Sequence, residues 1–81
     1  MTIQLIHGQF LAREAIEIIT QMIHVKIKFQ ENKIHSHSSE EDIKMRERRI
    51  RELQKDLYEA RMKIEKSPNA EVSLSSEIII D

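Results

Sequence analysis

Two of the four histidines lie close enough in the sequence to bind one metal ion. His35 and His37 are two residues apart, and Glu40 and Glu41 follow them. Imidazole nitrogens and carboxylate oxygens are ligands that zinc and nickel take in proteins. The chain has no cysteine, and no third strong ligand lies at a recognisable spacing. We therefore expect solvated histidines in a polar connector, with no bound metal and no cofactor.

Basic side chains are concentrated between residues 44 and 55, where six of them occur with two acids. The guanidinium fork of arginine suits phosphate groups. The acids alternate with the bases, however, and no aromatic or asparagine side chain lies between them to stack on bases or read their edges. The pattern favours a solvated, salt-bridged helix face, and binding to a nucleic-acid backbone is the alternative. The basic residues are Lys44, Arg46, Arg48, Arg49, Arg51 and Lys55.

The composition argues against an enzyme. A chain of 81 residues forms one small domain that buries only about 60% of its unfolded surface. Its single glycine, Gly8, excludes the glycine-rich loops that bind phosphate. Glu14, Glu17, Glu31 and His24 supply acids and a base, but no nucleophile or pocket-forming loop accompanies them. We therefore expect a protein without catalytic residues.

Hydropathy and net charge exclude other classes of protein. No apolar run approaches the roughly 18 residues of a membrane-spanning helix, and no basic, apolar leader begins the chain. The net charge of −1 provides no overall attraction to nucleic acid or to a membrane surface. These features predict a soluble, cytoplasmic protein that does not bind membranes.

The elements that must position these side chains begin with a helix over about residues 11–34. Its apolar residues form two adjacent stripes with spacings of three and four, and together they cover roughly 200° of the helix surface. One partner helix cannot cover so wide a face. The first stripe comprises Ala15, Ile18, Met22, Val25 and Phe29, and the second comprises Ala12, Ile16, Ile19, Ile23, Ile27 and Ile34.

A polar connector over residues 35–39 leads into a second helix over about residues 40–66. Ser39 with Asp42, or Ser38 with Glu41, fits a helix N-cap followed by an acid three residues later. The apolar residues of this helix follow a heptad, as in a coiled coil. Arg46 is the one charged residue in that seam, where it either reaches solvent at the edge or fixes the alignment of the helices. The a positions are Ile43, Ile50, Leu57 and Ile64, the d positions are Arg46, Leu53 and Ala60, and Pro68 follows the helix as its stop.

Short strands are expected at both ends of the chain. Ile3, Leu5 and His7 alternate with other residues over about residues 2–7, and Gly8 then breaks the pattern. This alternation places His7 on the same side as Ile3, where we expect it to be partly buried. Alternation over about residues 71–80 predicts a second strand, with a flexible acidic tail as the rival interpretation. A short connector makes the two helices an antiparallel hairpin, which places the two strands side by side. The predicted fold is a single domain over residues 1–81, mainly α within the α+β class, with the order β-α-α-β.

This order of elements resembles a group of short bacterial proteins that have no assigned activity. The resemblance rests on Gly8, Phe10, Glu14 and Ala15 and on the layout of strand, helical hairpin and strand. It implies the same architecture and no particular function.

The wide apolar face indicates a structural or interaction module that binds further copies of itself. A two-stranded ribbon is marginal alone, and a hairpin leaves part of the wide face open, so we expect a homodimer or higher oligomer. An unknown protein partner, or nucleic acid bound through the second helix, is the alternative. The predicted interface residues are Ile16, Ile19, Met22, Ile23, Ile27 and Phe29 on the first helix, with Leu5, Ile78 and Ile80 on the strands.

Overall fold

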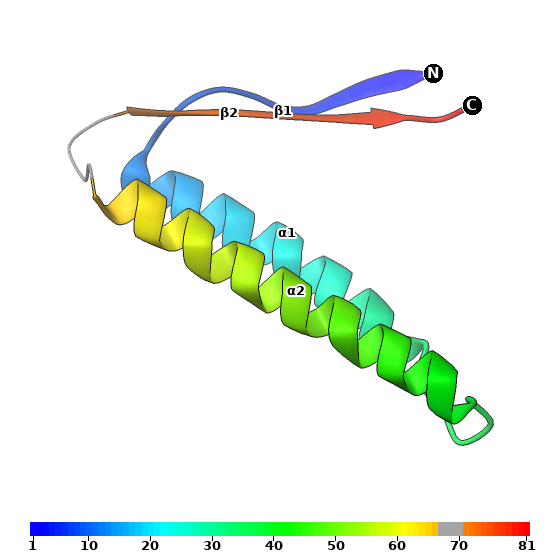
Figure 1. The fold of residues 1–81 in the computed structure, drawn as a ribbon. Coiled ribbons are helices and arrows are strands. Elements are labelled where there is room, and N and C mark those ends of the chain that lie inside the picture. The colour runs from blue at the N-terminus through cyan, green and yellow to red at the C-terminus, as the bar shows by residue number, and fades with distance from the viewer. Residues whose placement is uncertain (67–70) are drawn as a thin grey trace.

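The computed structural model describes residues 1–66 and 71–81 and confirms the predicted fold. Its elements are β1 (Thr2–Leu11), α1 (Ala12–Asn32), α2 (Glu40–Glu65) and β2 (Glu71–Ile79). The helices form an antiparallel hairpin, and the strands form an antiparallel ribbon. Figure 1 shows that the hairpin and the ribbon start from one common end and diverge, with both chain termini at the far end of the ribbon. The Cα atoms extend 48 × 33 × 13 Å, so this V-shaped molecule is thin.

The first strand is longer than the alternation of residues predicted, because it continues through Gly8 to Leu11. Gly8 has a φ of 154°, a backbone conformation that L side chains rarely adopt. The glycine is therefore accommodated inside the ribbon, where the sequence pattern indicated a break.

A bulge at Leu5 changes which side chains of β1 face the helices. Ile3 pairs with Ile78 and Ile6 pairs with Ser76, so one extra residue lies between these two rungs. Residues directly opposite each other in an antiparallel pair point to the same side. The bulge thus places Ile3 and Ile6 on one face, which we call the inner face.

The inner face of the ribbon turns toward α1, and its outer face is polar except at its ends, where Leu11 and Ile79 are exposed. Phe10, Val72 and Leu74 of the inner face pack against the core. His7, expected on the same side as Ile3 and partly buried, pairs instead with Ser75 on the outer face and is exposed. The bulge is the physical reason, since it reverses the alternation between Ile3 and His7.

The heptad predicted for α2 is confirmed by burial. All seven a and d residues are buried or half-buried, and Asp42 is the one other residue of α2 that is not exposed. Leu53 and Ile64 are the buried members of this set. Charged and polar side chains occupy most of the remaining positions, and Met45, Tyr58 and Met62 among them are exposed, so α2 offers a single narrow seam to α1.

Both helix starts follow from local hydrogen bonds. Ser39 is the N-cap of α2, and its hydroxyl accepts a hydrogen bond from the backbone N–H of Asp42 at 3.1 Å. Leu11 precedes α1 and has no side-chain acceptor, but its own N–H donates to the Glu14 carboxylate at 3.0 Å. The expected stop at Pro68 lies outside the described residues.

The core is small and lies where the ribbon joins the hairpin. Ala12, Ala15 and Ile64 form it, and Ile16 and Ile19 pack against it. Ala15 is 0% exposed. Its methyl group allows the ribbon and both helices to approach one another closely at this junction.

Replacing Ala15 with leucine should therefore destabilise the fold. Three extra carbon atoms must enter a filled junction, and overpacking of this kind costs about 1–3 kcal/mol. The measurement is urea unfolding followed by circular dichroism at a fixed protein concentration. Gln21→Leu, at an exposed position of the same helix, is the control and should change the unfolding free energy by less than about 0.5 kcal/mol. Equal stability of the two variants would contradict this description of the core.

Candidate functional site

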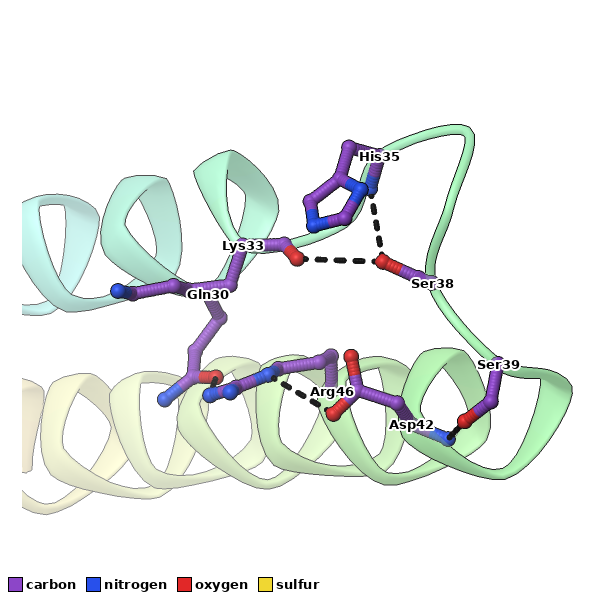
Figure 2. A network of polar contacts seen from close by, with 7 residues as sticks. All are labelled: Gln30, Lys33, His35, Ser38, Ser39, Asp42 and Arg46. Carbon is purple, nitrogen blue, oxygen red and sulfur yellow. Dashed lines mark hydrogen bonds and ion pairs between the residues drawn. The ribbon is translucent and has the colours of Figure 1, made fainter.

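A polar contact joins the two helices near the connector, as Figure 2 shows. Arg46 Nη1 donates a hydrogen bond to Gln30 Oε1 at 3.0 Å, and Arg46 Nε lies 3.6 Å from Asp42 Oδ1. The Arg46 side chain is 24% exposed and that of Asp42 is 35% exposed. The arginine is thus partly covered within the seam, hydrogen-bonded to α1 and ion-paired within α2, and its covered Nε makes no hydrogen bond. The two contacts link one position of α1 to one position of α2.

The histidines of the connector are held by its turn. The His35 N–H donates to Ser38 Oγ, and the His37 N–H donates to His35 Nδ1 at 3.2 Å. Both histidine side chains are exposed, with ring centroids 6.2 Å apart. Within residues 1–66 and 71–81, no group of three or more His, Cys, Asp or Glu side chains is arranged to hold a metal ion.

The basic side chains of α2 lie mostly among acidic partners. Lys44, Arg46, Arg49 and Lys55 each have a carboxylate within 4.0 Å, supplied by Glu40, Asp42, Glu52 and Glu59 respectively. Arg48 and Arg51 are exposed on the same helix. The ion pairs are those of a salt-bridged helix face, and binding of nucleic acid to this face stays a prediction.

An apolar groove lies where the ribbon diverges from α1. Its volume is about 250 Å³. Lys26, Ser75 and Ser76 also contribute to its lining, so the groove is almost entirely hydrocarbon with one charged side chain. The apolar lining residues are Ile6, Ile18, Ile19, Met22, Ile23 and Leu74.

The apolar stripe of α1 continues beyond this groove into solvent. Val25 is 70% exposed and Phe29 is 55% exposed. Lys33 Nζ lies 5.2 Å from the centroid of the Phe29 ring, a cation–π distance. Neither the ribbon nor α2 covers this outer end of the stripe.

The far half of the ribbon is also apolar and uncovered. Ile3, Leu5, Ile78 and Ile80 are all exposed, and Ile79 is 68% exposed. Backbone hydrogen bonds between Met1 and Ile80 extend the pairing to the chain ends. The groove, the outer stripe of α1 and the far ribbon together form what we call the apolar surface, the candidate functional site of this chain.

The predicted interface residues fall into two groups by their exposure. Ile16, Ile19, Met22, Ile23 and Ile27 are half-buried along α1. The exposed group comprises Leu5, Phe29, Ile78 and Ile80.

Sequence reasoning left Val25 and Ile6 out of the predicted interface. Val25 was detectable from its place in the first stripe of α1, and it is among the most exposed apolar residues of that helix. Ile6 carried no such signal, because the bulge at Leu5 that turns it toward α1 is not visible in a regular alternation of residues.

No family model matches the chain, and neither the curated proteins nor the solved structures contain a match to it. Within the described residues, neither helix is both long and apolar enough to cross a membrane.

The contact between Arg46 and Gln30 predicts an asymmetry between two substitutions. Gln30→Met removes the acceptor and leaves a partly covered guanidinium, which should lower the unfolding free energy by about 1–2 kcal/mol. Arg46→Met removes the charge together with its need for a partner and keeps the aliphatic stem, so stability should stay within about 1 kcal/mol of the parent. The double variant should resemble Arg46→Met.

Urea unfolding of all three variants measures this coupling, and Arg48→Met on the exposed face of α2 is the matched control. If the loss of unfolding free energy in the double variant equals the sum of the two single losses, the two side chains do not interact.

Proposed function

We propose that this chain is a non-catalytic, cytoplasmic interaction module that self-associates through α1 and its terminal strands, as a homodimer or higher oligomer. One observation carries the proposal. The chain exposes 6606 Å² of accessible surface, whereas a folded monomer of 9.6 kDa exposes roughly 5,100 Å². A second copy bound to the apolar surface would account for the difference.

The size of the excess fits a protein–protein interface. About 1,500 Å² separates the two areas. This is about twice the roughly 800 Å² that a standard interface removes from each partner, and it lies in the range of obligate homodimers, which remove about 1,000–2,500 Å² from each. The radius of gyration of 15.5 Å is likewise larger than the roughly 12 Å of a compact chain of this length. Association of two thin, open molecules would restore an ordinary ratio of surface to volume.

The chemistry of the apolar surface favours a second copy over an ion or a small polar ligand. Its residues are isoleucine, leucine, valine, methionine and phenylalanine on elements that run along most of the molecule's length. Contiguous apolar areas of this kind mark interaction sites in monomeric chains. A two-stranded ribbon also requires further strands or a covered face for stability in water, and a second copy supplies both.

Val25→Asp and Phe29→Asp should each weaken self-association without unfolding the chain. Both side chains are more than half exposed in the single chain, so an aspartate there costs little until a partner covers it. In size exclusion with light scattering we expect the parent to have a mass of at least twice 9.6 kDa. The dissociation constant of each variant should be at least tenfold higher than that of the parent.

His24→Asp is the matched control, since His24 is exposed and adjacent to Val25 but lies on the polar side of α1. Its mass should equal that of the parent. A parent protein that stays a monomer at high micromolar concentration would end the proposal.

Ile23→Asp should have a different effect from Val25→Asp. Ile23 is half-buried and lines the groove between α1 and the ribbon, so a carboxylate there is poorly solvated even in a single chain. We expect loss of helical circular dichroism or a drop of about 2 kcal/mol or more in unfolding free energy. A folded variant with the parent's mass would contradict the role given to the groove.

A further inference from the structure

The two edges of the ribbon differ in their capacity to accept another strand. Within the described residues the sheet has two strands, so β1 and β2 each have one free edge. The β1 edge is interrupted by the bulge at Leu5 and by the unusual backbone of Gly8. Bulges, prolines and lysines are the devices by which proteins block strand edges. β2 has none of them from Glu71 to Ile79, and its nine residues are regular.

We propose that the second copy adds its β2 to this regular edge, antiparallel to the first β2. The result is a four-stranded sheet in the order β1-β2-β2-β1. The inference rests on the self-association proposed above and specifies which elements of the terminal strands meet.

The two faces of the ribbon support this arrangement. Two identical strands that pair antiparallel are related by a twofold axis perpendicular to the sheet, which keeps like faces on the same side. The inner faces of the two ribbons, with Leu74 and Ile78 of each copy, would then form one continuous apolar face of the four-stranded sheet. Both helical hairpins would lie on that side, where the exposed end of the α1 stripe at Val25 and Phe29 meets the other copy.

Charge and length select the register of this pairing. With the axis at Ser75, the midpoint of β2, all nine residues of the strand have partners. Glu71 then lies opposite Ile79, and Ser73 lies opposite Glu77, so no two acids are directly opposed. An axis at Leu74 would oppose Glu71 to Glu77, and directly opposed like charges are destabilising.

An axis displaced the other way is also disfavoured. With the axis at Ser76, Glu71 lies opposite Asp81, another acid, beyond the end of β2. A shift that opposes residues of different faces is excluded, because it would turn the apolar side chains of one copy outward. The structure therefore assigns the axis to Ser75.

Single cysteines test this assignment directly, since the natural chain has none. In Ser75→Cys the two cysteines would face each other across the axis, with Cα atoms about 4.5–5.5 Å apart, which is within disulfide range. We expect a disulfide-linked dimer on mild oxidation with diamide, seen in gels without reductant, together with the parent's mass under reducing conditions.

Two matched variants locate the contact. Ser73→Cys lies on the same strand and face, but its copies would be more than about 13 Å apart along the strands. His7→Cys lies on the same rung as Ser75 but on β1, three strand spacings or about 14 Å from its equivalent. Cross-linking of Ser75→Cys at least ten times faster than both supports the proposal.

Each other result overturns it. Faster cross-linking of His7→Cys would place the contact at the β1 edge, and fastest cross-linking of Ser73→Cys would place the axis elsewhere on β2. A reduced protein that has dimer mass while Ser75→Cys does not cross-link would refute strand pairing and leave self-association through α1 standing. Monomer mass for the parent would refute both proposals.

Discussion

Helix α2 presents α1 with a single line of apolar side chains, because its sequence keeps a seven-residue repeat and places polar or charged groups at most other positions. Leu53 and Ile64 are the buried residues of that line. One facing stripe of α1 is enough to cover it. The stripe of α1 that holds Ala15, Val25 and Phe29 is left for the ribbon to cover. The ribbon reaches it near Ala15 and then diverges, so Val25 and Phe29 at the far end stay in solvent. The open apolar surface follows from this imbalance between the two helices.

Side-chain size along α1 accounts for where the ribbon leaves the helix. Ala12 and Ala15 allow a close approach at the junction, where Phe10 and Val72 pack on the core. Bulkier residues such as Met22 follow, and the apolar groove begins beside them. At the other end of the hairpin the constraint is polar, since Arg46 contacts one residue from each helix, Gln30 of α1 by a hydrogen bond and Asp42 of α2 by an ion pair.

Patterns that repeat were readable from the sequence, and single irregular residues were not. The heptad of α2 predicted seven of its eight covered positions, because one period governs 26 residues, and Asp42 is the eighth. The extent of β1 was missed because Gly8, usually a strand breaker, adopts a φ of 154° inside the ribbon. The bulge at Leu5 was hidden, since Ile3, Leu5 and His7 alternate as a regular strand does. The angle between ribbon and hairpin has no local signal, because it depends on packing between residues far apart in the chain.

The irregularities of β1 also bear on how large an assembly this chain can form. The centre of the ribbon's outer face is polar, with His7 and Ser75 exposed on it, and the apolar Leu11 and Ile79 of that face lie at its two ends. If strands join at the regular β2 edges, both outer edges of the resulting sheet are β1 edges, and each is interrupted at Leu5. Blocked edges prevent further strand addition, and a twofold contact that uses the same surface on both copies is closed. The bulge that turns Ile6 toward α1 would thus also limit the sheet to two chains.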